Sequence, residues 1–392
     1  MKVLYVTAEC WPFAKTGGLG DVAYALPKAL KREGVDVRVM IPKYSTIPTY
    51  LKDRLKKVGE FSVDVAWRSQ YCGVEQLELD GVTFYFIDNE YYFKRDGADS
   101  IYGHGDDAER FLFFTNAVLK SIDKLGFYPD VINMNDWHTG MLPLLLKEKY
   151  SYIPRYRNIK TMYTIHNLQY QGIFPKEILG DVLDVDPGHF YNGDIEYHGQ
   201  INFMKAGINF ADKVSTVSPT YAQEIRDPAF AYRQEGILNA RAGDTWGILN
   251  GMNQEEFNPE TDPLIPYHFN KDDLSGKKKD KQELIKALGL SITPGVPIIG
   301  MVTRLTEQKG LDLVKYMLDE IMCTENVAFV ILGTGDYEYE EFFRYMEEKY
   351  KGSGLDRNCF RENKKAKGTI GNFWKGRIKS VVVISGEDRM GR

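Results

Sequence analysis

The first part of the chain alternates short apolar runs with stretches of helical periodicity. An apolar run from Val3 to Val6 precedes a glycine-rich loop, a helical pattern from Asp21 to Glu33, and a second apolar run from Val35 to Ile41. Gly34 stands where a helix commonly ends in a left-handed turn. This order of strand, loop, helix and strand predicts a βαβ unit with parallel strands.

The period of the apolar residues shortens to that of β-strands between Val58 and Asp88. The runs Val74 to Leu79 and Val82 to Ile87 flank Asp80-Gly81, a dipeptide typical of tight hairpins, so we expect an inserted antiparallel element. From Asn89 to Asp107, aromatic and polar residues follow one another without a period. This segment predicts a long surface loop, of the kind that often carries function.

Strands with polar residues directly after them recur further along the chain. A helical pattern from Phe111 to Leu125 leads into strands predicted at Val131 to Met134, Thr161 to Ile165 and Lys213 to Val217. They are followed by Asn135-Asp136-Trp137-His138, His166-Asn167 and Ser218-Pro219. Because doubly wound sheets bind ligands beyond the carboxyl ends of their strands, we expect a site at these residues.

A second α/β alternation begins after a polar stretch in which Lys277 to Lys279 predict a solvated helix face. The predicted strand Ile298 to Val302 is followed by Arg304, Lys309 and Gly310, and the strand Val327 to Leu332 by Gly333-Thr334-Gly335. After Gly352 the pattern fades, and only Val381 to Ile384 predicts another strand. We therefore expect two domains, 1–245 and 246–392, with the second incomplete and atypical after residue 352.

Composition narrows the class of protein. A length of 392 residues suits two domains, and 43% hydrophobic with 27% charged residues is typical of a soluble globular protein. A net charge of −5 argues against a nucleic-acid partner. The apolar opening is too short for a signal peptide or a membrane span, so we expect a cytoplasmic protein with no membrane partner.

The glycine loop from Lys15 to Asp21 is the first candidate site. Backbone amides at a helix start carry partial positive charge, glycines allow close approach of a phosphate, and Lys15 adds a full charge. The loop lacks both the spacing of a dinucleotide fold and the order of a P-loop. Taken alone, Gly17 and Gly18 fit a plain structural turn equally well.

Other candidates also have structural interpretations. His166 could be a core histidine, although its place after a strand beside Asn167 favours an active-site role, and Asp136 and His138 fit either interpretation. Arg304 and Lys309 suit a diphosphate but could be a surface pair. Asp184-Val185-Asp186 could bind a metal, but a solvated loop is favoured, and we predict no metal site.

Six segments together resemble the bacterial glycogen synthases and plant starch synthases. They are Ala8–Asp21, Asn135–His138, Thr164–Gly172, Gly247–Gly251, Arg304–Gly310 and Leu332–Asp336. The resemblance runs from Met1 to about Gly352 and implies a GT-B fold, two Rossmann-like α/β domains facing a cleft. It implies retaining transfer of glucose from ADP-glucose to the non-reducing end of an α-1,4-glucan (glycogen or maltooligosaccharide).

The resemblance also implies roles for individual residues, and it implies no cofactor. Arg304 and Lys309 would hold the diphosphate, which makes a divalent metal unnecessary. His166 and Asp136 would lie around the transferring glucose. The remaining substrate-binding residues would be Lys15, Gly17, Gly18, Asp21, Tyr102, Asn167, Asn250, Gly333 and Gly335.

The C-terminal part departs from the family pattern. The family carries a Phe-Glu-Pro-Cys-Gly type motif and a second Thr-Gly-Gly stretch, and neither occurs in this sequence. We interpret the tail as the product of a frameshift or truncation, with a genuine variant as the second interpretation, and expect little or no synthase activity from the chain. The alternative is an inactive remnant that binds maltooligosaccharide through its first domain. A phosphorylase or a sugar-nucleotide epimerase is a less favoured interpretation.

Overall fold

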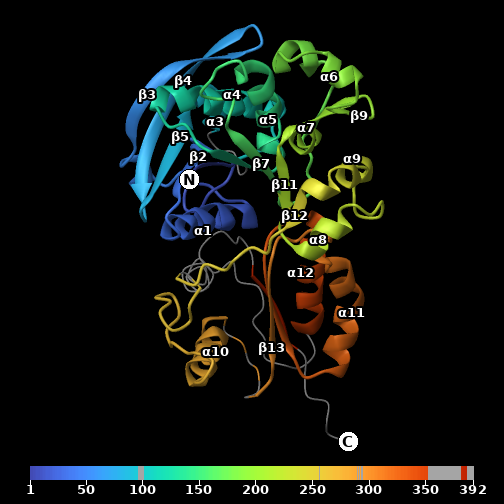
Figure 1. Cartoon of the computed structure of the whole chain (residues 1–392). Helices are drawn as coiled ribbons and strands as arrows, with labels where there is room; N and C mark the ends of the chain where they lie inside the picture. The colour runs from blue at the N-terminus through green and yellow to red at the C-terminus, as the bar shows by residue number, and fades with distance from the viewer. Residues whose placement is uncertain are drawn as a thin grey trace, which may run out of the picture. The chain divides into compact units, whose positions relative to one another are not determined.

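The computed structural model describes residues 1–95, 101–255, 257–288, 290, 292, 295–351 and 381–385. The chain divides into two compact units, Met1–Met252 (unit 1) and Asn253–Arg392 (unit 2). Strands and helices alternate in both units (Figure 1). No helix among the described residues is long and apolar enough to cross a membrane.

Unit 1 contains a sheet of nine described strands in the order β12-β11-β7-β6-β1-β2-β5-β4-β3. The strands are β1 (Lys2–Val6), β2 (Asp36–Pro42), β3 (Lys56–Val65), β4 (Arg68–Leu79), β5 (Val82–Asp88), β6 (Val131–Asn135), β7 (Lys160–Ile165), β11 (Lys213–Thr216) and β12 (Thr245–Gly247). From β12 to β5 all neighbours are parallel. The strand order reverses beside β1, which is where doubly wound sheets bind ligands.

Helices and short turns connect these strands. They are α1 (Gly18–Arg32), α2 (Thr49–Lys52), α3 (Glu90–Phe93), α4 (Asp107–Leu125), η1 (Trp137–Thr139), α5 (Leu142–Leu145), η2 (Leu146–Tyr150), η3 (Leu179–Leu183), α6 (Gly188–Tyr191), α7 (Phe203–Phe210), α8 (Pro219–Glu224), α9 (Glu235–Ala240) and η4 (Ala242–Asp244). A small antiparallel sheet contains β8 (Ile173–Phe174), β9 (Glu196–Tyr197) and β10 (Gln200–Asn202). The opening βαβ unit is as predicted, and Gly34 has a φ of 80°.

The predicted hairpin at Asp80-Gly81 is confirmed. Asp80 has a φ of 51° and Gly81 a φ of 77°, as a tight turn with two left-handed residues requires. The predicted antiparallel element is present in the pairing of β3 with β4 and of β4 with β5, but it continues the main sheet, because β5 also pairs in parallel with β2. Only β4 and β3 extend it antiparallel, and they form its long outer edge (Figure 1).

The segment after β5 is only partly the surface loop that its irregular sequence predicts, and residues 96–100 lie outside the described residues. Tyr92 and Phe93 of α3 are fully buried, and the ring centroid of Tyr92 lies 4.9 Å from that of Phe113 in α4. Ile101 is buried as well. The sequence of this segment does not predict the burial, because the burial comes from packing against α4 and not from a periodic pattern of apolar residues.

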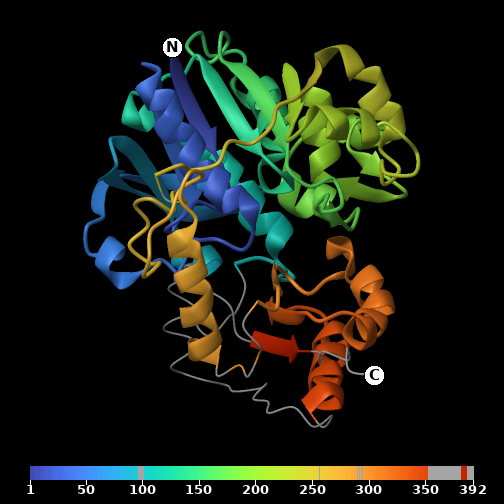
Figure 2. The same cartoon turned by 90° about the horizontal axis from the view of Figure 1, so that it is seen from below.

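Unit 2 is a smaller α/β arrangement. It contains α10 (Ser275–Leu288), β13 (Ile298–Val302), η5 (Glu307–Lys309), α11 (Leu311–Thr324), β14 (Ala328–Leu332), α12 (Tyr337–Lys351) and β15 (Val381–Ser385). β14 pairs in parallel with β13 and antiparallel with β15, and α11 lies beside α12 (Figure 2). Lys277 to Lys279 are exposed on α10, as predicted. Apart from β15, the tail beyond Lys351 lies outside the described residues.

Candidate functional site

The glycine loop between β1 and α1 surrounds an anion that belongs to the protein itself. The carboxylate of Glu9 accepts hydrogen bonds from the amides of Thr16 (2.6 Å) and Gly17 (3.0 Å), and from the Thr16 hydroxyl (2.6 Å). Glu9 is buried, and burial raises its pKa against the opposing effect of these bonds. The loop amides thus hold the carboxylate of Glu9, and binding of an anion from outside the protein stays a prediction.

Lys15 and Asp21, both predicted site residues, form an ion pair at 2.6 Å. Asp21 lies in the first turn of α1, which starts at Gly18 with Gly17 as its N-cap. A side chain at Gly20 would place its Cβ 3.0 Å from Cγ of Lys15. The loop therefore requires a small residue at position 20 to keep the lysine in its place.

Asp136 joins the carboxyl ends of β6 and β7. Its Oδ1 accepts hydrogen bonds from the backbone amides of His166 (2.8 Å) and Asn167 (3.3 Å), so three predicted site residues lie together. The side chain is buried, and burial raises its pKa to about 7 while the two amide bonds oppose the rise. Asp136 also combines a φ of 56° with a ψ of −179°, a strained pairing that essentially only glycine adopts and that clusters at functional sites.

His166 is half-buried and uncharged at neutral pH. Burial lowers its pKa to about 4, although the charge of Glu9 acts in the opposite direction. Its Nε2 lies 2.9 Å from Oδ1 of Asn135, the last residue of β6. Asn135 is fully buried; it belongs to the polar segment predicted to follow this strand, but the sequence assigned it no role of its own.

His138 packs as an aromatic core residue. Its ring stacks on Trp137 with 3.9 Å between centroids and contacts Phe111 and Tyr102 at 4.7 Å each. Burial lowers its pKa to about 3, and neither ring nitrogen has a hydrogen-bond partner among the described residues. Of its two interpretations, the structure supports the core histidine.

Tyr102 connects this aromatic group to the glycine loop. Its hydroxyl forms a hydrogen bond with the hydroxyl of Thr16. Thr16 in turn binds Glu9, whose charge acts to raise the pKa of His166 and whose own pKa is raised by the charge of Asp136. Predicted residues of unit 1 between Lys15 and Asn167 are therefore linked by one network of contacts, and their role as a site stays a prediction.

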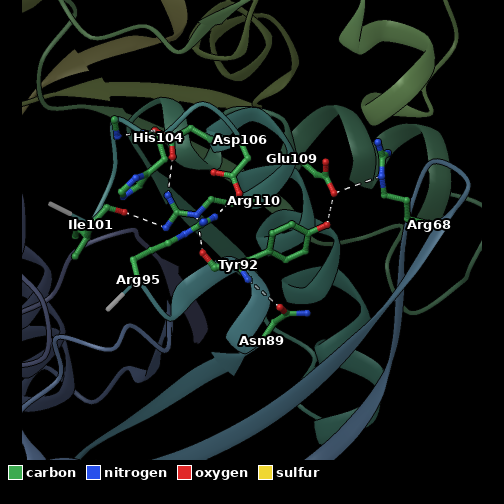
Figure 3. Close-up of polar contacts among 11 residues, drawn as sticks. Arg68, Asn89, Tyr92, Arg95, Ile101, His104, Asp106, Glu109 and Arg110 are labelled. Atoms are coloured by element: carbon green, nitrogen blue, oxygen red, sulfur yellow. Dashed lines mark hydrogen bonds and ion pairs between the residues drawn. The ribbon is translucent and has the colours of Figure 1, made fainter. Parts of the chain in front are cut away.

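A buried ion pair holds the loop that carries Tyr102. Arg110, fully buried in α4, donates to Asp107 at 2.6 Å, to the carbonyl of Tyr92 at 2.8 Å and to that of Ile101 at 3.1 Å (Figure 3). The other carboxylate oxygen of Asp107 accepts the amides on the far side of Tyr102, from Gly103 (2.7 Å) and His104 (3.2 Å). The backbone on both sides of Tyr102 is thus fixed from the protein interior.

The two cations predicted in unit 2 are exposed after its first strand. Arg304 follows β13, and Lys309 ends η5 just before Gly310, the N-cap of α11. Close backbone packing leaves no room for a side chain at Gly333 or Gly335. An added Cβ would lie 2.0 Å from the carbonyl oxygen of Thr303 and 2.1 Å from that of Leu305, respectively.

Two other predicted features lie away from these clusters. Asn250 is exposed in the segment after β12. Asp184 pairs with Lys149 at 2.8 Å, and Asp186 accepts the amide of Gly188 at 2.8 Å. Both aspartates thus have structural partners within unit 1.

The sequence assigned no individual role to Glu9, Asn135 or Arg110. A signal existed for the first two, because each is a polar residue at the end of a buried strand, where Asp136 and His166 were predicted. For Arg110 the helical pattern gave no sign of burial, since most arginines on helices are exposed.

These two α/β units, with acidic, imidazole and cationic groups after their strands, define a glycosyltransferase of the GT-B class. The family model "Starch synthase catalytic domain" matches residues 2–240. The chain belongs to the glycogen synthase and starch synthase family, and the predicted family and fold class are confirmed.

Individual relatives support the assignment. The chain is 59% identical over 351 residues to the glycogen synthase of Clostridioides difficile (strain 630), covering 89% of this chain and 73% of that protein. It is 50% identical over 350 residues to the glycogen synthase of Anoxybacillus flavithermus, covering 89% and 72%. The solved catalytic domain of starch synthase IV from Arabidopsis thaliana, bound to ADP and acarbose, matches with a TM-score of 0.83 and 30% identity, covering 95% of this chain and 76% of that one.

Proposed function

We propose that the chain transfers glucose from ADP-glucose, with retention of configuration, to the non-reducing end of an α-1,4-glucan such as glycogen or a maltooligosaccharide. The observation that carries this proposal is the 59% identity to a glycogen synthase over 73% of its length. The ADP and acarbose bound to the Arabidopsis enzyme support the same ligand classes here. Because the proposed donor is a sugar nucleotide, we place the reaction in the cytoplasm.

In unit 2, Arg304 and Lys309 are the proposed diphosphate-binding residues. Breaking the bond between glucose and the diphosphate leaves negative charge on the leaving oxygens, and fixed cations stabilise that charge in the transition state. Both side chains are exposed at the strand-to-helix transition after β13, so a ligand can reach them. Gly333 and Gly335 would border the nucleotide. The proposal includes no metal and no cofactor.

In unit 1, the glycine loop is proposed to contact the donor through Lys15. The Gly17 amide donates to Glu9, so the lysine charge, held by Asp21, is the part of the loop that we assign to the diphosphate. Gly18 at the start of α1 would lie next to it. Glu9 then has a structural role, since its carboxylate orients the loop by accepting the amides of Thr16 and Gly17.

Asp136 and His166 are the proposed groups around the transferring glucose. The glucosyl group gains positive charge as the bond to the diphosphate breaks, so nearby oxygen and nitrogen acceptors stabilise it. A carboxylate and a neutral imidazole meet this need, whereas an imidazolium would oppose it. The other proposed contacts come from Tyr102, Asn167 and Asn250.

Transfer by the purified full-length chain tests the proposal, with radiolabelled ADP-glucose or UDP-glucose and maltohexaose as substrates. Arg304→Gln should raise the KM for ADP-glucose by tenfold or more, because a charged hydrogen bond contributes roughly 1.5–3 kcal/mol. Lys271→Gln is the matched control, since Lys271 is an exposed cation of the same unit that pairs only with the neighbouring Asp272 among the described residues. Equal kinetics of Arg304→Gln and the parent would contradict the role of Arg304.

Calorimetry separates the proposed enzyme from the inactive remnant. The enzyme should bind both ADP-glucose and maltohexaose, whereas the remnant would bind maltohexaose alone. The comparisons favour the enzyme over the remnant, and over the expectation of little or no synthase activity, because the relatives that match over 350 or more residues are glycogen synthases.

A further inference from the structure

We propose that Asn135 is a positioning residue that locks the ring of His166 in one tautomer, with the proton on Nε2 and the lone pair on Nδ1. The inference rests on the proposed function only where it places His166 beside the transferring glucose. The tautomer itself follows from the hydrogen-bond network within unit 1.

The orientation of the Asn135 amide is fixed by its neighbours. Its Nδ2 donates to the carbonyl oxygen of Val6 (3.0 Å) and to Oδ1 of Asn133 (3.0 Å). A backbone carbonyl can only accept, so the nitrogen must face Val6. Asn133 is oriented in turn, because its oxygen must be the atom that accepts from Nδ2 of Asn135, which leaves its own Nδ2 to donate to the Thr164 hydroxyl at 3.1 Å. The oxygen of Asn135 therefore faces the other way.

The oxygen of Asn135 meets Tyr5 and His166. The Tyr5 hydroxyl donates to it at 3.0 Å, and Nε2 of His166 lies 2.9 Å away. Two acceptors cannot form a hydrogen bond with each other, so Nε2 must carry the proton. Asn135 is fully buried in β6, between β1 and β7, and these bonds use all its polar hydrogens and both lone pairs of its oxygen.

The consequence for His166 is a defined chemical role. Burial keeps the ring neutral near pH 7, so Nδ1 bears no proton. This nitrogen can accept a hydrogen bond from a sugar hydroxyl, but it cannot donate one to a phosphate oxygen. The Asn135 network thus makes His166 a group for the sugar and not for the diphosphate.

Long-range ¹H–¹⁵N correlation NMR of the full chain with ¹⁵N-labelled histidine tests the lock directly. The chain has 6 histidines, and the loss of one set of signals in His166→Gln assigns the ring. At pH 7 we expect a protonated Nε2 and an unprotonated Nδ1. A protonated Nδ1, an imidazolium or an exchanging mixture would overturn the inference. This readout needs no enzyme activity, so it stays separate from the proposed function.

Substitution tests the consequence for catalysis. Asn135→Asp keeps an acceptor for Nε2 but adds negative charge, so it should raise the pKa of His166 and move the acidic limb of the pH–rate profile upward. It should also lower kcat about tenfold with little change in KM, as expected for an interaction made in the transition state. Asn116→Asp, another buried asparagine outside the site, is the control and should leave the profile in place. An unmoved profile in folded Asn135→Asp would overturn the inference, and if that variant fails to fold, the tautomer of the parent decides.

Discussion

The raised pKa of Asp136 predicts that this residue costs stability at neutral pH. The carboxyl has a pKa of about 7 in the folded chain and about 3.9 when unfolded. Between these values the folded state holds a proton that the unfolded state has released. Stability from this group is therefore present at low pH and is lost as the pH rises toward 7.

Asp136→Asn removes the charge and keeps an oxygen to accept the amides of His166 and Asn167. At pH 8 the variant should be more stable than the parent. Each pH unit between 5 and the folded pKa contributes about 1.4 kcal/mol, so the advantage of the variant should grow by about 3 kcal/mol from pH 5 to pH 8. Glucose transfer should fall at the same time, because the carboxylate is lost.

Urea denaturation of parent and variant at pH 5 and pH 8 measures this difference. His138 and His166 have lowered pKa values and act in the opposite direction, since protonating them as the pH falls favours unfolding. Their effect is the same in both proteins and cancels in the comparison. If the stability difference between the two proteins does not change from pH 5 to pH 8, the reasoning about Asp136 is refuted.

Two further predictions concern packing. Arg110→Leu should destabilise unit 1 by about 3–5 kcal/mol in urea denaturation, because it leaves Asp107 as a buried charge without its cation. Arg344→Ala breaks two partly exposed ion pairs, with Glu340 and Glu341, and should cost less than about 1 kcal/mol. A smaller effect for Arg110→Leu than for the control would contradict the role of the buried pair. Gly333→Ala should lower the urea midpoint of unit 2 by an amount equivalent to about 1–3 kcal/mol, since its added Cβ would overlap the carbonyl oxygen of Thr303. Gly300→Ala is the control and should leave the midpoint in place, because a Cβ added at Gly300 meets no neighbouring atom within 4 Å. Equal midpoints for the two alanine variants would show that the close approach at Gly333 is not required.

The elements that sequence predicts well are those set by local chemistry. Asp80-Gly81 forms its turn because both residues tolerate left-handed backbone angles, and Ser218 caps α8 by accepting the amide of Tyr221 at 2.8 Å. The parallel pairing of β5 with β2 and the burial of Tyr92 depend on partners distant in sequence, and no local pattern predicts them.

The same distinction applies to the candidate site. Asp136 and His166 could be predicted because parallel strands bring their carboxyl ends to one edge of the sheet. The hydrogen bond from Tyr5 to Asn135 joins residues 130 positions apart, and only the strand order places β1 beside β6. Glu9 was missed for a chemical reason, since a glycine loop that suits a phosphate suits an internal carboxylate equally well.

The central claim is that this chain, as it stands, elongates a glucan. We would follow purified full-length protein with ADP-glucose and maltohexaose by proton NMR. We expect new α-1,4-linked glucose signals to appear in step with the release of ADP. Intact ADP-glucose in the presence of bound maltohexaose would contradict the claim and identify the chain as a glucan-binding remnant.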